Sequence, residues 1–243
     1  LPWGDLARVA QSYFMSDPMN PTQPGLIDFP RPDGSLYRGH LAQAGADRPG
    51  VVVLQEWWGL NPQICSVVER FAAAGFNALA PDLYHGRVTQ DPDEASHMMD
   101  GLDFAGATFQ DIRGAVAHLQ KAGSGPVAVM GFCMGGALTV ASAVHLPEVG
   151  AAECFYGIPP RDFADPAQIR IPFQGHFATR DTWCTPAAAG ALEQAMCGAG
   201  AQPEIHHYEA AHGFFNATRP QVYDPAQAEL AWTRTLAFLE RHL

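Results

Sequence analysis

Short runs that are wholly or largely apolar alternate with helical segments along most of this 243-residue chain, and this alternation constrains the fold more than any other feature. Strands that are apolar at every residue are buried on both faces, as in a parallel sheet covered by helices on either side. The pattern therefore predicts an α/β fold with a mostly parallel sheet of eight strands or slightly fewer. The predicted strands are Val51–Leu54, Ala78–Ala80, Val127–Met130, Ala151–Phe155, Ile169–Phe173 and the mixed segment Glu204–Tyr208. The predicted helices are Pro62–Ala74, Ala107–Ala122, Met134–His145, Pro186–Cys197 and Pro225–His242.

Two further strands precede this pattern. Ile27–Phe29 and Leu36–Ala42 flank the turn Pro32-Asp33-Gly34, in which proline presets φ and glycine tolerates a strained φ. We expect a hairpin at one edge of the sheet. A single sheet with helices on both faces commonly reaches this size, so residues 26–243 are predicted to form one domain.

Residues 1–25 have a different character. Asp5 is a candidate cap for a short helix with an apolar stripe from Leu6 to Phe14. Three prolines follow between Ser16 and Gly25 and forbid regular structure there. This stretch is predicted to be an N-terminal helix or tail that ends in a linker.

The charge balance limits the kinds of partner. The chain has 14 Lys and Arg against 25 Asp and Glu, a net charge of −11, and its single lysine is Lys121. A chain without a basic run has no cationic surface for nucleic acid or an anionic membrane. No stretch approaches the roughly 18 apolar residues of a membrane span. We expect a small-molecule ligand, no nucleic acid or membrane partner, and a monomer or small homo-oligomer.

The cysteines indicate a reduced environment. Their number is odd, and they show neither CxxC nor Cys/His ligand spacing. A cytoplasmic location is therefore predicted. His206 and His207 are adjacent in a predicted strand, so they point to opposite faces and cannot both bind one ion directly. Neither a metal nor another cofactor is predicted. The five cysteines are Cys65, Cys133, Cys154, Cys184 and Cys197.

The sequence Gly131-Phe-Cys133-Met-Gly135-Gly136 lies between a predicted strand and an alanine-rich helix. This G-x-C-x-G-G pattern is that of a nucleophile elbow, with cysteine in the place of serine. The glycines allow close backbone approach around a strained central residue. The turn lifts Cys133 above the sheet at a helix N-terminus, whose partial charge favours the thiolate. The alternatives are a buried cysteine or a phosphate-binding loop, although a phosphate loop would favour Lys, Ser or Thr after the glycines.

A cysteine nucleophile requires a base and an orienting acid from later loops. Asp181 follows the strand predicted at Ile169–Phe173, and His212 follows Glu204–Tyr208. The chain order of nucleophile, acid and histidine is the order that this topology needs. We therefore assign His212 as the base that activates Cys133, and Asp181 as the acid that orients it.

Glu56 and Trp57 follow the strand Val51–Leu54. In this topology that loop supplies one oxyanion donor, and the residue after the nucleophile supplies the other. The predicted donors are the backbone N–H groups of Trp57 and Met134. Glu56 is unusual, because a carboxylate beside an oxyanion hole opposes negative charge there; the alternative is a surface or capping glutamate.

These motifs together resemble the dienelactone hydrolase family. The resemblance covers about residues 26–243 and implies an α/β-hydrolase fold with a triad of Cys133, His212 and Asp181. It also implies that enol-lactones are opened by acyl transfer to sulfur, and that Glu56 takes part in activating a thiol that is protonated at rest. The motifs are Gln55-Glu56-Trp57-Trp58-Gly59-Leu60, Pro81-Asp82-Leu83-Tyr84, the Cys133 turn, Asp181 and His212-Gly213-Phe214.

The resemblance also implies a carboxylate substrate clamped by arginines, one of them four residues beyond the histidine. Asn216 occupies that position here, while Arg87 and Arg180 remain candidate cations. Aromatic residues around the predicted loops could line a roomy pocket. The candidate substrate-binding residues are Trp58, Tyr84, Arg87, Trp183, Phe214 and Asn216, and the other aromatics near these loops are Trp57, Phe132, Phe177 and Phe215.

The sequence thus predicts a cysteine-dependent hydrolase that opens enol-lactones such as dienelactone, to a maleylacetate-type acid, through a thioester. The substitution at Asn216 favours an alternative, a broader carboxylesterase for uncharged lactones or activated esters. A non-catalytic binding module is a second alternative, because Glu56 would lie beside the thiol and the first helix could dock a partner.

Overall fold

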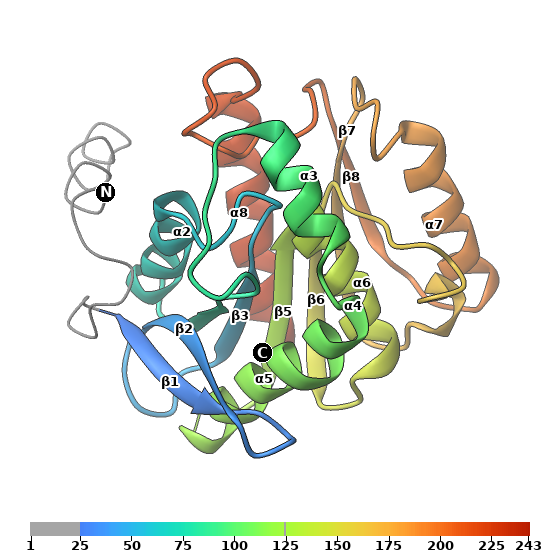
Figure 1. Ribbon diagram of the computed structural model, residues 1–243. Coiled ribbons are helices and arrows are strands. Elements are labelled where there is room, and N and C mark those ends of the chain that lie inside the picture. Colours follow the sequence, from blue (N-terminus) through green and yellow to red (C-terminus); the bar gives the residue numbers. More distant parts are fainter. Residues whose placement is uncertain (1–24, 124) are drawn as a thin grey trace.

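A sheet of eight strands forms the centre of the molecule (Figure 1). The structure, a computed structural model, describes residues 25–123 and 125–243. The strands lie in the order β1-β2-β4-β3-β5-β6-β7-β8. β2 is antiparallel to both of its neighbours, and every other pair is parallel. The bounds are β1 (Leu26–Pro30), β2 (Leu36–Ala42), β3 (Gly50–Leu54), β4 (Asn77–Pro81), β5 (Val127–Phe132), β6 (Val149–Phe155), β7 (Phe173–Ala178) and β8 (Glu204–Tyr208).

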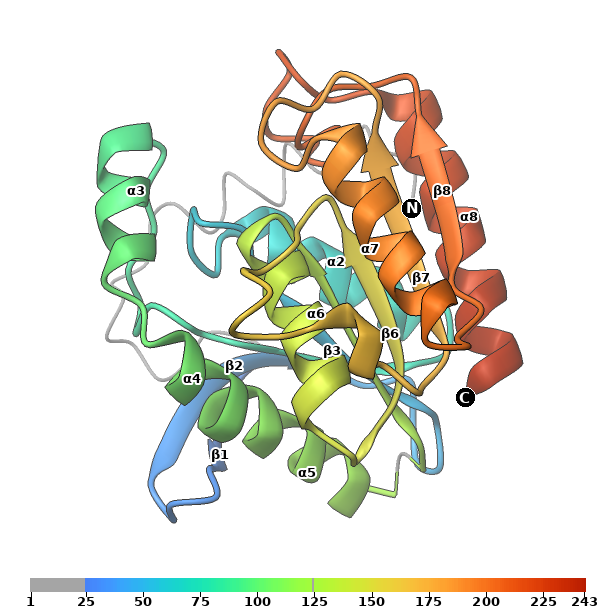
Figure 2. The same cartoon turned by 90° about the vertical axis from the view of Figure 1, so that its right-hand side faces the viewer.

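Helices cover both faces of this sheet, with α2 and α8 on one face and α5, α6 and α7 on the other (Figures 1 and 2). Residues of β3 alternate between two cores: Val51 and Val53 pack with α2, whereas Val52 and Leu54 pack with α5. Burial on both faces explains why this strand is apolar throughout. The helices are α2 (Pro62–Ala73), α3 (Pro92–Asp100), α4 (Phe104–Gly106), the π-helix η2 (Ala107–Ile112), α5 (Arg113–Lys121), α6 (Met134–His145), the 3₁₀ turn η3 (Pro166–Gln168), α7 (Pro186–Gly198) and α8 (Pro225–His242).

The predicted α/β fold with a mostly parallel sheet is confirmed. The predicted hairpin is also confirmed, since β1 pairs with β2 and occupies the sheet edge. Gly34 in its turn has φ of +84°, the conformation that favours glycine. The predicted N-terminal helix and most of the predicted linker lie outside the described residues.

The strand predicted at Ile169–Phe173 is wrong in position, because β7 begins at Phe173 and continues to Ala178. Its pairing with β6 starts at Phe173 opposite Ala152. Pro172 has no N–H to give to a sheet ladder, although its carbonyl accepts from Ala152 N at 3.0 Å. His176 and Phe177 therefore lie within the strand, and Asp181 follows the strand end more closely than the sequence indicated.

The region between β4 and β5 holds helices that the sequence analysis missed. α3 buries only Ala95 and Met98, so it has little apolar periodicity to detect. The sequence does contain a signal for the start of this helix, because Asp91 is its N-cap and Pro92 is its first residue. The helix predicted at Ala107–Ala122 begins as the π-helix η2 before it continues as α5.

Within residues 25–123 and 125–243, no helix combines the length and the apolar character that crossing a bilayer requires. The same residues contain no group of three or more His, Cys, Asp or Glu side chains arranged to hold a metal ion.

Candidate active site

Cys133 stands at the turn between β5 and α6, with φ of +56° and ψ of −115°. This conformation is strained for a residue with a side chain. The turn is fixed by backbone hydrogen bonds, because Cys133 N donates to Phe155 O at 3.0 Å and Ala137 N donates to Cys133 O at 3.1 Å. The side chain is partly exposed at the carboxyl edge of the sheet. This is the geometry that the G-x-C-x-G-G pattern predicts.

The glycines around Cys133 are required by close backbone approach. A Cβ on Gly131 would collide with the carbonyl of Gly135, and one on Gly135 would lie 2.5 Å from Leu54 O. A Cβ on Gly136 would lie 2.5 Å from Phe155 O. The first turn of α6 therefore packs directly on the ends of β3 and β6, and larger residues would displace Cys133.

His212 and Asp181 lie beside Cys133 as a hydrogen-bonded pair. His212 Nδ1 is 2.7 Å from Asp181 Oδ2, and the imidazole also makes a hydrogen bond with the Cys133 thiol. Asp181 is buried, and its Oδ1 accepts from the N–H groups of Trp183 at 2.7 Å and Cys184 at 2.9 Å. These bonds hold the carboxylate in one orientation toward the imidazole.

The protonation of His212 follows from these neighbours. Burial lowers the pKa of the imidazole, but the hydrogen bonds to Asp181 and Cys133 and their negative charges outweigh burial and raise the pKa to about 10. The site therefore stabilises an imidazolium next to the sulfur. This charge is the one that forms when a histidine takes a proton from a thiol.

Glu56 is buried at the same site, with an exposed fraction of 4%. Asn216 Nδ2 donates to Glu56 Oε2 at 2.6 Å, and the Tyr156 hydroxyl donates to Oε1 at 3.2 Å. The surface-glutamate alternative for Glu56 is therefore excluded. Burial raises the pKa of its carboxyl, whereas the bond from Asn216, the charge of His212 and the bond from Tyr156 oppose that rise.

The predicted oxyanion donors lie on adjoining segments. Met134 is the first residue of α6, so its N–H has no carbonyl partner within the helix. Trp57 follows Glu56 in the loop after β3, and that loop lies against the first turn of α6 through the contact between Gly135 and Gln55 O. Both segments border the sulfur.

A small cavity opens at Cys133 and His212, with a volume of about 120 Å³. Arg219 lies on its wall with its guanidinium 4.3 Å above the ring of Trp58, in a cation–π contact. Trp57 packs edge-on against Trp58 and Trp183, with ring centroids 5.0 and 5.4 Å apart. The predicted residues Trp58 and Trp183 therefore lie on the wall of the cavity that contains Cys133.

Four other predicted residues do not line the cavity at Cys133 and His212. Arg87 is exposed, pairs with Glu94 at 3.4 Å and lines a separate cavity that does not include Cys133. Arg180 is exposed on the surface beside the acid loop. Phe214 is fully buried in the core, and Tyr84 is buried with its hydroxyl 3.1 Å from Met134 Sδ. Tyr84 thus supports the residue after the nucleophile.

Two residues of this site were missed from the sequence. Tyr156 directly follows β6, a position at the carboxyl edge of the sheet that could have singled it out. Its ring centroid lies 5.0 Å from that of His212. Arg219 lies in an irregular loop seven residues after His212, and no periodicity or motif in the sequence marks it.

A mostly parallel sheet with helices on both faces, a strained nucleophile turn after a central strand, and an acid and a histidine on later loops define an α/β-hydrolase. The sequence profile of the dienelactone hydrolase family matches residues 37–243, and the chain belongs to this family.

Individual relatives agree with this assignment. The chain is 32% identical over 225 residues to a carboxymethylenebutenolidase of Pseudomonas sp. strain P51, covering 86% of this chain and 91% of that protein. It is 31% identical over 228 residues to protein usf of Aquifex pyrophilus, covering 90% and 98%. A solved structure from Klebsiella pneumoniae superposes with a TM-score of 0.79 at 25% identity, covering 89% and 98%. This chain is accordingly a hydrolase of lactone or ester bonds.

Proposed function

We propose that the protein opens enol-lactones of the dienelactone type by nucleophilic attack of Cys133. The observation that carries this proposal is the strained turn that presents Cys133 in contact with the His212–Asp181 pair. A non-catalytic binding module has no need of a nucleophile in a strained conformation next to an oriented base.

In the first half-reaction His212 takes the thiol proton, and the sulfur forms a bond to the lactone carbonyl carbon. The carbonyl electrons move to oxygen, and the oxyanion is held by the N–H groups of Trp57 and Met134. Collapse of this intermediate breaks the ring C–O bond, and the leaving oxygen takes the proton from the imidazolium. The product is a thioester on Cys133.

In the second half-reaction His212 takes a proton from water, which attacks the thioester carbonyl. The C–S bond breaks, and the sulfur recovers its proton as the acid is released. An enolate leaves more readily than an alkoxide, so a weakly basic thiolate suits an enol-lactone. Simple alkyl esters are therefore poor substrates.

Glu56 controls the ionisation of the Cys133 thiol before substrate binds. Its carboxylate opposes negative charge at the neighbouring sulfur and so disfavours the thiolate until substrate binds, and in its charged form it takes part in activating the thiol once substrate is bound. Asn216 and Tyr156 hold this carboxylate by hydrogen bonds. A thiol that ionises only with substrate present is protected from oxidation.

Arg219 supplies the cation for an anionic substrate. The side-chain amide of Asn216 donates to Glu56, so it does not bind the substrate carboxylate. Arg219 is the arginine that lines the cavity with Cys133. Replacement by Arg219→Gln lowers the ratio of kcat/KM for anionic dienelactone to that for its neutral methyl ester about tenfold or more. An unchanged ratio favours the broader carboxylesterase, which the engagement of Asn216 with Glu56 supports as a second candidate.

The decisive experiment follows dienelactone ring opening by ultraviolet absorbance with the native chain, Cys133→Ala and Cys197→Ala. Cys197 is an exposed thiol and serves as the matched control. We expect activity in the native and Cys197→Ala proteins, loss in Cys133→Ala, and an acyl mass adduct in acid-quenched native protein. Equal activity of all three proteins excludes Cys133 as the nucleophile, and inactivity of the native protein excludes the lactone.

A further inference from the structure

Cys133 lies where two cavities of different character meet. The first is the small cavity that contains Arg219. The second has a volume of about 630 Å³ and also contains Cys133, His212 and Trp183. The indole of Trp183 is 62% exposed and stands on the wall of both cavities. A substrate whose carbonyl lies at the sulfur can therefore extend in two directions.

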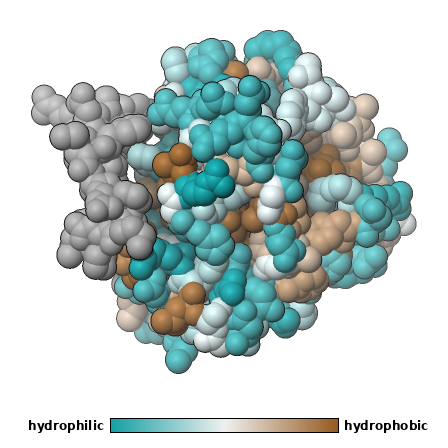
Figure 3. All heavy atoms as spheres, in the orientation of Figure 1, coloured by the Kyte–Doolittle hydropathy of each residue, from teal (hydrophilic) through white to brown (hydrophobic). Residues whose placement is uncertain are grey.

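The second cavity, here called the apolar groove, runs between α3, α4, the start of α6 and the loop after β6. Apolar surface gathers to the right of α3 in this region (Figure 3). Asp162, at an exposed position, is the acidic residue of a wall that contains no lysine or arginine. The side chains that give the groove its apolar character are Met99, Phe104, Ile158, Pro159, Pro160 and Phe163.

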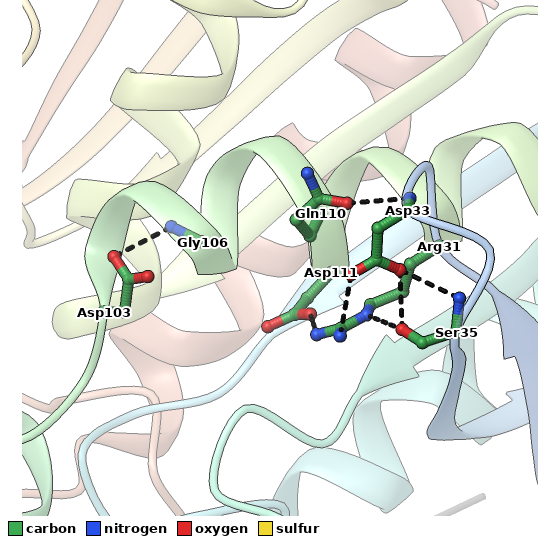
Figure 4. A network of polar contacts seen from close by, with 7 residues as sticks. All are labelled: Arg31, Asp33, Ser35, Asp103, Gly106, Gln110 and Asp111. Carbon is green, nitrogen blue, oxygen red and sulfur yellow. Dashed lines mark hydrogen bonds and ion pairs between the residues drawn. The ribbon is translucent and has the colours of Figure 1, made fainter.

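The walls of the groove are held in place by contacts outside it. Asp103 caps the turn that carries Phe104 by accepting from Gly106 N at 2.9 Å (Figure 4). The following π-helix is tied to the β1–β2 hairpin, since Arg31 Nη1 lies 2.9 Å from Asp111 Oδ1. On the other side His145 Nε2 is 2.7 Å from Phe163 O. The groove is therefore formed before a ligand enters.

The direction of each part of a substrate follows from charge. The leaving oxygen develops negative charge and is best placed on the side of Arg219, whereas an uncharged acyl chain gains from burial in the apolar groove. A volume of about 630 Å³ lies within the range that holds a drug-sized ligand, roughly 300–1,000 Å³, and the small cavity does not.

From this arrangement we infer that the substrate class extends to lactones and to open-chain esters of activated alcohols whose acyl side carries a medium-length apolar chain, which lies in the groove lined by Ile158 and Phe104. This inference rests on the proposed function, because it uses Cys133 as the nucleophile. It goes further by assigning acyl and leaving parts to different cavities. A compact lactone alone would leave the groove unfilled.

The test compares p-nitrophenyl acetate, butyrate and hexanoate at concentrations below aggregation. We expect kcat/KM to rise from acetate to hexanoate by at least about tenfold, because each buried methylene favours binding in the transition state. Lengthening the alcohol side in hexanoate esters of activated alcohols brings no such gain. A rise with the alcohol side alone overturns the assignment of acyl chain to groove.

Matched variants test the groove itself. Ala188 lies on its wall in the first turn of α7, whereas Ala187 is the exposed neighbour in the same turn. Ala188→Phe lowers the hexanoate-to-acetate ratio of kcat/KM at least about tenfold, and Ala187→Phe leaves it unchanged. Ile158→Ser, which adds no bulk, lowers the ratio as well. Melting temperatures of the three variants confirm that they fold.

The two proposals fail in different ways. A native protein that hydrolyses acetate and hexanoate equally, with a ratio indifferent to Ala188→Phe and Ile158→Ser, overturns the groove while the hydrolase function stands. A native protein that hydrolyses none of these esters and no dienelactone overturns the proposed function, and the groove assignment falls with it.

Discussion

Asn216 donates its side-chain amide to Glu56 Oε2 at 2.6 Å, although the two residues are 160 positions apart. The amide cannot be turned around, because its oxygen accepts from the backbone N–H of Thr218 at 3.0 Å. A backbone N–H only donates, so the nitrogen of Asn216 must face Glu56. The bond favours the charged form of a carboxyl that burial would otherwise neutralise.

Replacement of Asn216 tests this relationship. Asn216→Ala removes the donor that opposes the raised pKa of Glu56, so that pKa rises further. We expect kcat/KM to fall about tenfold near neutral pH and to recover partly as pH rises. The measurement is the pH profile of kcat/KM for dienelactone. The matched control is Gln90→Ala, an exposed amide on the cavity wall next to Asn216. A loss that is equal at every pH would indicate a purely structural role.

The Asp181–His212 pair determines the titration of the imidazole. Asp181→Asn removes a charge and a hydrogen bond that raise the pKa of His212 to about 10, so that pKa falls. Nitrogen NMR of labelled histidine is expected to show that His212 loses its proton at a lower pH in the variant than in the native chain. Asp162→Asn, at an exposed acid in the groove, serves as the control for simple loss of charge. A His212 that titrates at the same pH in both proteins contradicts the prediction.

The same pair links stability to pH. The pKa of His212 is higher in the folded chain than its ordinary value of 6.5. Its contribution to stability is therefore complete below about pH 6.5 and is lost as pH rises toward 10. Asp181→Asn should lower kcat about 10⁴-fold, as the same replacement of the orienting acid does in a Ser-His-Asp triad. Urea unfolding of the native chain and the variant converges at alkaline pH if this is correct.

Gly157 and Gly190 form a contrasting pair of glycines. A Cβ on Gly157 would collide with Cys133 O and lie 2.6 Å from Ala137 N, so Gly157→Ala displaces the nucleophile turn. We expect a loss of about 2 kcal/mol in unfolding free energy and a large loss of activity. Gly190 lies in α7 with nothing within 4 Å of an added Cβ, so Gly190→Ala stabilises the fold by about 0.5–1 kcal/mol. Denaturant titration measures both, and an unaffected Gly157→Ala protein contradicts the argument.

Glu153 and His176 form a buried neutral pair away from the nucleophile. Glu153 Oε2 lies 3.0 Å from His176 Nε2, and both side chains are fully buried. Burial raises the pKa of Glu153 well above its usual value and lowers the pKa of His176 well below its own. The contact is therefore a hydrogen bond between uncharged groups rather than an ion pair.

The buried Glu153 carboxyl makes the free energy of unfolding fall as pH rises. Above about pH 4.5 the unfolded chain ionises Glu153 while the folded chain does not, which costs up to about 1.4 kcal/mol per pH unit. Glu153→Gln removes this penalty, so the melting temperature of the variant relative to the native chain rises from pH 5 to pH 8. Glu209→Gln, at an exposed position, shows no such trend. A constant difference across the range contradicts the neutral pair.

Local patterns predicted the fold well where burial is complete. β3 and β5 are apolar because helices cover both faces of the sheet, and the strand runs at Val51–Leu54 and Val127–Met130 mark their positions. α3 was missed because it buries only two residues, and its others are exposed or only partly buried. The start of β7 was misplaced because Ile169 and Ile171 are apolar without joining the sheet ladder, which begins at Phe173.

The sequence by itself determined the turn at Cys133, since G-x-C-x-G-G between a strand and a helix predicts both the strained residue and the close backbone approach that the glycines allow. It also indicated the order of Cys133, Asp181 and His212 along the chain. Only the tertiary structure placed Asn216 and Tyr156 on Glu56 and Arg219 on Trp58. These contacts join irregular loops that follow different strands, and no periodicity encodes which loops meet, because their approach is set by the packing of the whole sheet.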